Sequence, residues 1–402
     1  MKDHAYLIFV FEFLTIVTPL LFFLTLAFHL LFLFYACFIV AISLAIFLRK
    51  DLGYFWIALQ NNVISDEKPP CVTVFRAVVN VFTVICILAA DFTCFPRRFL
   101  KTESFGYGLM DTGVGLFVII YSFTDSPYKP RRSLRYFTYK ILPFFVLGLG
   151  RYFCTEALRY QHQVTEYGTQ WNFFITLLVL TLFNEIVLNF LKSVSEVFFL
   201  AVLFLVTHEL VLAIGLKQWI LSDAPRLNFF SSNREGIFSL LGYETLSLSG
   251  MVISYFLPKK NDLFRKYVSV LLRYFLGFLL CITLTILADF SIGVFRKTAN
   301  SGYIFWILSL TFLTFVSIFS CDIALRICIH SRTPIVDSAS LIMKAINYNG
   351  LLFFLLGNVL TGLINLNIKT LLVNEVQSVL IILLYMFTCC AFIVFCTRRI
   401  YV

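Results

Sequence analysis

The sequence predicts an all-α, polytopic membrane protein with about twelve transmembrane helices and no soluble domain. Hydrophobic residues make up 60% of its 402 residues and charged residues only 13%, whereas soluble domains carry about 25% charged residues. The mean hydropathy is +0.90. Apolar runs of about 20 residues recur, which is the length that a membrane-crossing α-helix needs, and the alternation typical of a membrane β-barrel is absent.

The predicted spans follow one another with short polar connections, none of which is long enough for a soluble domain. We therefore expect residues 1–402 to form a single integral-membrane domain. The expected spans are 5–26, 28–48, 72–90, 107–124, 138–158, 172–190, 196–215, 237–256, 268–289, 302–322, 349–366 and 377–396.

The distribution of Lys and Arg predicts the orientation. If the N-terminus lies in the cytosol, the cytosolic segments hold 18 of these residues and the opposite side holds 10. The positive-inside rule then places both termini in the cytosol. The net charge of +10 is explained by anchoring at anionic lipid and not by binding to nucleic acid.

The segment Asp91–Asp111, DFTCFPRRFLKTESFGYGLMD, gathers charge between two apolar runs and would open to the lumenal side. Charge beside a bilayer is costly, so a dense cluster there usually has a function. Its charged residues are Asp91, Arg97, Arg98, Lys101, Glu103 and Asp111.

Four blocks of this sequence, in the family's order, resemble signatures of the inositol acyltransferases of GPI-anchor biosynthesis (PIG-W). They are ILAADFTCFPRRFLKTESFGYGLMDTGVG (within 86–115), LGLGRYFCTEALRYQHQVTEYGTQWNFFIT (147–176), NREGIFSLLGY (233–243) and FFLLGNVLTGLINL (353–366). The resemblance implies an enzyme of the endoplasmic reticulum membrane that moves a fatty acyl chain, typically palmitoyl, from acyl-CoA onto the inositol ring of glucosaminyl-phosphatidylinositol. The family usually has about thirteen spans, with a further helix before the one that starts here near residue 5, and we expect this chain to depart from the family by lacking that helix.

Acyl transfer to a hydroxyl needs a base and a group that stabilises the oxyanion. Asp91 closes an apolar helix, where the helix dipole and the poor solvent should both make its carboxylate more basic. Lys101 follows Pro96, which breaks the helix, so the chain can turn back and bring Lys101 near Asp91. We therefore predict Asp91 as the general base and Lys101 as its electrostatic partner; an interfacial ion pair is the alternative.

The other charges of the segment are candidate substrate-binding residues. The guanidinium groups of Arg97 and Arg98 match phosphate oxygens of CoA or of the lipid headgroup, although interfacial snorkelling explains them equally well. Glu103 and Asp111 are expected to balance these cations. Asp111 lies near the start of the next helix, where a negative charge is favoured.

The second and third blocks supply further candidate substrate-binding residues at helix entrances: His162, Glu166, Tyr167, Trp171, Asn172, Asn233, Arg234 and Glu235. His162 is a rival general base. Tyr167 and Trp171 also fit an aromatic belt. For Asn233, Arg234 and Glu235, a structural ion pair is an alternative to headgroup binding.

Two other classes stay open from the residues alone. A transporter could use Asp111 or Glu185 as an intramembrane proton site, and a receptor or channel subunit is suggested only by the 48 Phe residues. Because HExxH, CxxC, Walker and GxSxG motifs are absent from the sequence, we expect no metal or redox cofactor, and acyl-CoA would be a co-substrate.

Two further sequence patterns are weaker. Asn358 and Asn365 lie in an apolar span and are expected to hydrogen-bond to a neighbouring helix. The sequence ADFSIGVFRKT, which contains Asp289, is similar to ADFTCFPRRFLKT around Asp91, but no longer repeat supports the match. We interpret this short similarity as chance.

Overall fold

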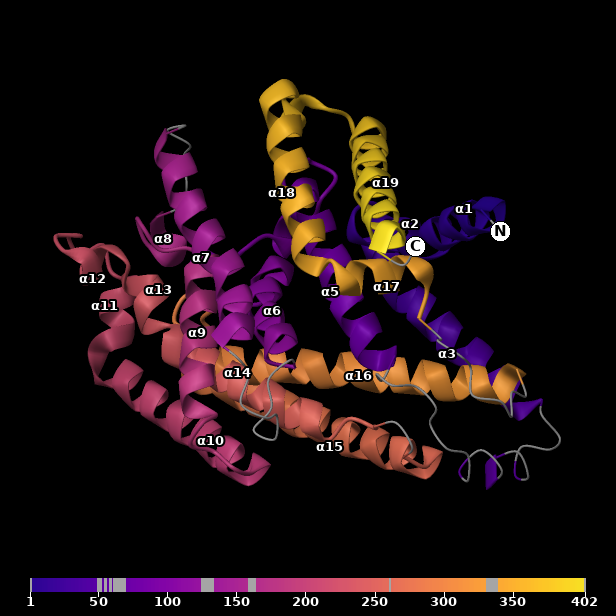
Figure 1. Cartoon of the computed structure of the whole chain (residues 1–402), viewed down its shortest axis with the longest axis horizontal. Helices are drawn as coiled ribbons and strands as arrows, with labels where there is room; N and C mark the ends of the chain where they lie inside the picture. The colour runs from indigo at the N-terminus through magenta and orange to yellow at the C-terminus, as the bar shows by residue number, and fades with distance from the viewer. Residues whose placement is uncertain are drawn as a thin grey trace. The chain divides into compact units, whose positions relative to one another are not determined.

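The computed structural model describes residues 2–48, 70–123, 134–157, 164–259, 262–329 and 339–400, together with Gly53, Trp56, Ile57 and Gln60. The regular elements of these residues are all helical (Figure 1). Eight helical stretches among them are long and apolar enough to cross a membrane: Tyr6–Leu24, Cys71–Ala89, Val194–Leu221, Arg234–Tyr255, Arg265–Ser291, Ser301–Ala324, Gly350–Asn367 and Glu375–Thr397.

Each of the twelve predicted spans coincides with a helix. The eight long stretches account for eight spans, and shorter apolar helices at Phe28–Ala41, Leu109–Ser122 and Phe173–Val187 account for three. The remaining span corresponds to α7 (Leu134–Ala157), which has Pro143 in its interior. The structure confirms an all-helical, multi-span membrane protein, and the number of helices that cross the bilayer stays a prediction.

The chain forms two compact units, of which the first comprises residues 1–101, 258–275 and 313–402. Short turns of other helical type lie at Phe13–Val17, Phe28–Leu30, Arg97–Phe99 and Thr370–Leu372. Its α-helices are α1 (Lys2–Glu12), α2 (Thr18–Leu24), α3 (Leu31–Phe47), α5 (Pro70–Ala89), the start of α15 (Phe264–Ser291), the end of α16 (Ser301–Ile329), α17 (Leu341–Tyr348), α18 (Gly350–Asn367) and α19 (Glu375–Ile400).

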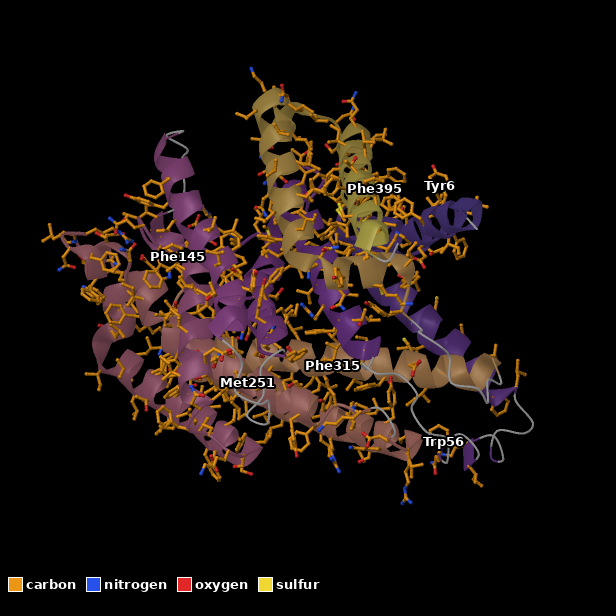
Figure 2. The ribbon with its side chains drawn as sticks, in the orientation of Figure 1. Tyr6, Trp56, Phe145, Met251, Phe315 and Phe395 are labelled. Carbon is orange, nitrogen blue, oxygen red and sulfur yellow. The ribbon has the colours of Figure 1, made fainter. Side chains whose placement is uncertain are left out.

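Aromatic side chains form a core of the first unit. Phe75 of α5 stacks on Phe315 of α16 with ring centroids 4.9 Å apart, and Tyr274 of α15 meets the same ring edge-on at 5.6 Å. Phe315 is fully buried, whereas Phe395 of α19 is 55% exposed (Figure 2). α18 packs on both α5 and α19, and this contact brings polar residues of α18 to the end of α5.

The second unit comprises residues 102–257 and 276–312. α10 (Val194–Val211) packs along α14 (Leu240–Tyr255) through the buried residues Val197, Ala201, Leu248 and Met251. Met251 is labelled in Figure 2. Short turns lie at Leu109–Asp111 and Leu212–Leu216. Besides the remaining parts of α15 and α16, its helices are α6 (Thr112–Ser122), α7, α8 (Val164–Tyr167), α9 (Phe173–Val187), α10 (Val194–Val211), α11 (Lys217–Leu221), α12 (Phe229–Ser232), α13 (Arg234–Phe238) and α14 (Leu240–Tyr255).

Candidate active site

The proposed base lies where the sequence predicts it, just after an apolar helix. α5 ends at Ala89, and the backbone N–H of Asp91 donates to the carbonyl of Leu88 in the closing turn. The side chain of Asp91 is half-buried. Its Oδ2 accepts a hydrogen bond of 2.8 Å from Nδ2 of Asn365 on α18. The expectation that Asn365 joins two helices is therefore confirmed.

The equivalent expectation for Asn358 is wrong. Its Nδ2 donates to the carbonyl of Phe354, one turn earlier in the same helix. The two asparagines lie seven residues apart on α18, yet only Asn365 has a polar partner on a neighbouring helix among the residues described. A polar residue in an apolar span therefore joins two helices only where the neighbouring helix presents a polar group.

The cations that follow Asp91 are all exposed. Nη1 of Arg97 donates to the carbonyl of Ala90 at 3.4 Å, so this side chain also covers the carboxyl end of α5. The guanidinium of Arg98 lies 4.5 Å from the centroid of the Phe28 ring. Both contacts are made by the guanidinium groups, although both arginine side chains are exposed, and Lys101 is exposed as well.

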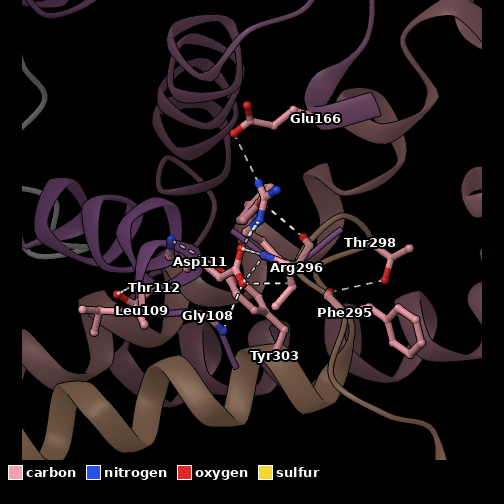
Figure 3. A network of polar contacts seen from close by, with 12 residues as sticks. Gly108, Leu109, Asp111, Thr112, Glu166, Phe295, Arg296, Thr298 and Tyr303 are labelled. Atoms are coloured by element: carbon pink, nitrogen blue, oxygen red, sulfur yellow. Dashed lines mark hydrogen bonds and ion pairs between the residues drawn. The ribbon is translucent and has the colours of Figure 1, made fainter. Parts of the chain in front are cut away.

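In the second unit, a buried ion pair ties the end of the charged segment to the connection between α15 and α16. Nε of Arg296 lies 2.7 Å from Oδ1 of Asp111, and both side chains are buried (Figure 3). Nη1 of Arg296 lies 3.4 Å from Oε1 of Glu166, which is partly exposed. Asp111 was expected to balance Arg97 and Arg98; its partner is Arg296 instead, because the fold brings this distant arginine to the start of α6.

Asp111 also fixes the loop that precedes it. Its Oδ2 accepts from the backbone N–H of Thr102 at 3.0 Å, from the Thr102 hydroxyl at 2.8 Å and from the N–H of Gly108 at 3.1 Å. Asp111 is the last residue of the turn Leu109–Asp111 and stands directly before α6, as predicted. With both oxygens engaged, the carboxylate is a structural anchor for residues 102–108.

Hydroxyl groups of two tyrosines complete this network. The hydroxyl of Tyr303 donates to the backbone carbonyl of Asp111 at 2.9 Å and accepts from the N–H of Gly115 at 3.1 Å. The hydroxyl of Tyr243 donates to the carbonyl of Arg296 at 3.4 Å. Burial opposes the charge of Arg296, but the neighbouring Glu166 and the other acidic groups outweigh it and raise the arginine pKa. Arg296 is therefore a permanent cation.

The second and third sequence blocks meet at Asn233. Its Oδ1 accepts from the backbone N–H groups of Gln170 at 2.9 Å and Trp171 at 3.0 Å, and its Nδ2 donates to Oε1 of Gln170 at 2.8 Å. Gly168 has a φ of +128°, and a Cβ there would lie 2.5 Å from the Asn233 Cα. Only glycine fits this position without strain.

The remaining polar residues of the second block stabilise the start of α9. Oδ1 of Asn172 accepts from the N–H groups of Phe174 and Ile175 as the helix N-cap, and its Nδ2 donates to the carbonyl of Gly148 at 2.8 Å. The indole N–H of Trp171 donates to the hydroxyl of Thr176 at 2.9 Å. Tyr167 is buried, and burial raises its pKa well above the ordinary value.

Arg234 and Glu235 are buried in a network of their own. Glu235 receives a bidentate pair from Arg226, at 2.6 and 3.0 Å. Arg234 donates to the carbonyls of Ala224 and Ser222 and lies 3.8 Å from Glu235. The structure thus contains the ion pair that was the alternative to headgroup binding, and these residues fix the connection between α11 and α13.

The sequence analysis did not predict some residues of the network, and some predicted residues do not belong to it. Arg296, Thr102 and Tyr303 were not predicted, although the short similarity around Asp289 contains Arg296. Glu103 is exposed and lies close enough to Lys297 to act on that lysine's charge. His162, the rival base, lies outside the described residues.

These contacts separate the two groups of candidates by the chemistry open to them. The Asp111 carboxylate is saturated by donors, whereas the Asp91 carboxylate is half-exposed and has one hydrogen bond within the described part of the chain. Nearby, burial raises the pKa of the Cys94 thiol, which disfavours a thiolate nucleophile. Of these two carboxylates, that of Asp91 is the one exposed to a molecule that approaches from solvent.

Comparison with known proteins identifies relatives along nearly the whole chain. The model of the GWT1 family matches residues 1–396. The GPI-anchored wall transfer protein 1 of Schizosaccharomyces pombe is 34% identical over 341 residues, which cover 82% of this chain and 73% of that protein. The protein of the same name from Yarrowia lipolytica is 33% identical over 344 residues (80% and 71%). The human glucosaminyl-phosphatidylinositol-acyltransferase PIGW is 30% identical over 372 residues (82% and 74%).

Proposed function

The chain belongs to the GWT1 family, and we infer from this membership that it is a glucosaminyl-phosphatidylinositol acyltransferase of GPI-anchor biosynthesis. The match of the family model to residues 1–396 is the observation that carries this conclusion. The transporter alternative loses its support, because both carboxylates that would carry protons are paired: Asp111 with Arg296, and Glu185 with Lys140 at 3.2 Å.

In this proposal, acyl-CoA is the acyl donor and palmitoyl is the chain that is transferred. Asp91 takes the proton of an inositol hydroxyl, the hydroxyl oxygen attacks the thioester carbon, and Lys101 stabilises the oxyanion that forms. The carbon–sulfur bond then breaks, the ester forms, and CoA leaves as a thiolate that is protonated from solvent. The half-exposed position of Asp91 and the buried state of Cys94 favour this direct transfer over an acyl-cysteine intermediate.

The proposed location is the endoplasmic reticulum membrane, with both termini in the cytosol and the active site toward the lumen. The charge distribution supports this orientation. Because acyl-CoA is cytosolic, the thioester must reach Asp91 through a cavity or lateral portal between helices. A photo-crosslinking acyl-CoA analogue should label residues near Asp91 and Lys101. Labelling confined to the cytosolic segments would contradict the portal.

The test of the reaction uses membranes from cells that lack their own activity. Labelled palmitoyl-CoA and glucosaminyl-phosphatidylinositol are supplied, and the labelled lipid product is measured for the wild type, Asp91→Asn and Lys101→Ala. We expect product from the wild type and a loss of about 10²- to 10⁴-fold for Asp91→Asn, the usual contribution of a general base.

The matched control is Asp262→Asn, the same substitution in a surface pair with Lys266, which should keep full activity. If Asp91→Asn still forms product, the reaction stands but Asp91 is not its general base. His162 is then the next candidate. Absence of product from a well-inserted wild type would contradict the reaction itself.

A further inference from the structure

Asn365 carries an acceptor whose partner is missing. Its side-chain Oδ1 is buried and has no hydrogen-bond partner among the described residues. The identity of this atom is set by chemistry: an ionised carboxylate only accepts, so the atom that faces Oδ2 of Asp91 at 2.8 Å must be the amide nitrogen. The amide oxygen therefore points away from that bond.

Four asparagines among the described residues, Asn80, Asn184, Asn347 and Asn365, have a buried Oδ1 without a hydrogen-bond partner, and Asn365 is the one of these that is bonded to the proposed base. Leaving such a group unsatisfied costs about 1–3 kcal/mol, and most buried polar atoms in folded proteins have a partner. This orphan acceptor belongs to the residue that holds the proposed base, and its position is set by α18 packing on α5. A donor brought by the substrate would satisfy it.

The substrate class named above has the required donors. Two of the six oxygens of the inositol ring carry the phosphate and the glucosamine, and the other four are hydroxyls, so the substrate offers other hydroxyls near the one that is acylated. An amide oxygen can accept from a hydroxyl but does not take its proton at neutral pH, whereas a carboxylate can do both. A carboxylate and an amide held side by side can therefore distinguish two neighbouring hydroxyls.

We propose that Asn365 is a substrate-contact and positioning residue, which rests on the function inferred above. Its Nδ2 holds the Asp91 carboxylate in one orientation, and its Oδ1 accepts a hydrogen bond from the ring hydroxyl next to the one that is acylated. The pair thus selects which hydroxyl of the inositol ring meets the base. No proton is transferred to Asn365, and the proton of the reacting hydroxyl goes to Asp91.

The test pairs enzyme variants with substrate analogues. Glucosaminyl-phosphatidylinositols that each lack one ring hydroxyl other than the acylated one are compared with the complete substrate, for the wild type and for Asn365→Leu. In the wild type, one of these deoxy analogues, lacking a hydroxyl next to the acylated position, should lose about 10- to 100-fold in kcat/KM, the loss expected when a buried acceptor is left unpaired. In Asn365→Leu the complete substrate should fall by a similar factor, and the preference over that analogue should shrink to about twofold.

Asn358→Leu is the matched control, because Asn358 lies on the same helix and bonds only within it in the described structure; it should discriminate like the wild type. Equal use of all the deoxy analogues by the wild type would overturn the proposal without any variant. An unchanged preference of Asn365→Leu for the complete substrate over the deoxy analogue would also overturn the proposal. The Oδ1 of Asn365 would then bind a water molecule or have a purely structural role. A wild type that does not acylate the complete substrate would overturn the proposed function as well.

Discussion

Replacement of Arg296 by leucine should destabilise the protein far more than replacement of either exposed arginine near Asp91. The substitution leaves Asp111 buried without its counter-charge, since Nε of Arg296 lies 2.7 Å from Oδ1 of Asp111 and both side chains are buried. Breaking one side of a buried pair costs about 3–5 kcal/mol. At about 1.36 kcal/mol for each power of ten, the unfolding equilibrium should shift by about two to four powers of ten.

The assay is unfolding of the purified protein in mixed micelles of mild detergent and sodium dodecyl sulfate, followed by tryptophan fluorescence. Trp171, Trp219 and Trp306 all lie in the unit that contains the ion pair. Glu166→Gln is the comparison within the network, because its longer contact of 3.4 Å and its partial exposure predict a cost below about 1 kcal/mol.

The double variant Asp111→Asn/Arg296→Leu gives the decisive comparison. It removes both charges, so most of the stability lost in Arg296→Leu should return. If Arg296→Leu were as stable as the wild type, or if the double variant were no more stable than the single one, the buried charge would not be the cause and our reasoning would be refuted.

Two further predictions concern single residues. Gly168→Ala should lower the free energy of unfolding by about 2 kcal/mol or more, because of its φ of +128° and the nearby Asn233 backbone; Gly113→Ala, where nothing lies within 4 Å of an added Cβ, should be neutral or slightly stabilising in the same unfolding assay. Cys94→Ala should keep acyl-transfer activity within about twofold per molecule of inserted protein, because a buried thiol with a raised pKa is a poor nucleophile. A tenfold loss in Cys94→Ala would indicate an acyl-cysteine route.

The helices could be predicted from the sequence because membrane insertion depends on local composition. A run such as 72–90 is apolar enough to span by itself, and its helix, α5, occupies Pro70–Ala89. Even the polar features that act within one turn were predictable, such as Asn172 at the entrance of α9. These features require knowledge of only a few neighbouring residues.

The partners within the candidate site could not be predicted in the same way. Asp111 was assigned to Arg97 and Arg98 because they are near in sequence, yet the fold supplies Arg296. Asn358 and Asn365 have similar apolar surroundings, and only the packing of α18 on α5 decides that Asn365 meets Asp91. Such pairings depend on which helices become neighbours, which no local pattern contains.

The Asp111–Arg296 pair also constrains how the protein is made. The two residues are 185 positions apart in the chain. At a synthesis rate of about 5–20 residues per second, Asp111 leaves the ribosome about 10–40 s before Arg296 exists. During that interval the carboxylate needs water or lipid headgroups as its surroundings, because hydrocarbon would exclude it. We therefore expect the start of α6 to stay at a membrane surface until α15 and α16 have been inserted, so that the Asp111–Arg296 pair forms late in biogenesis.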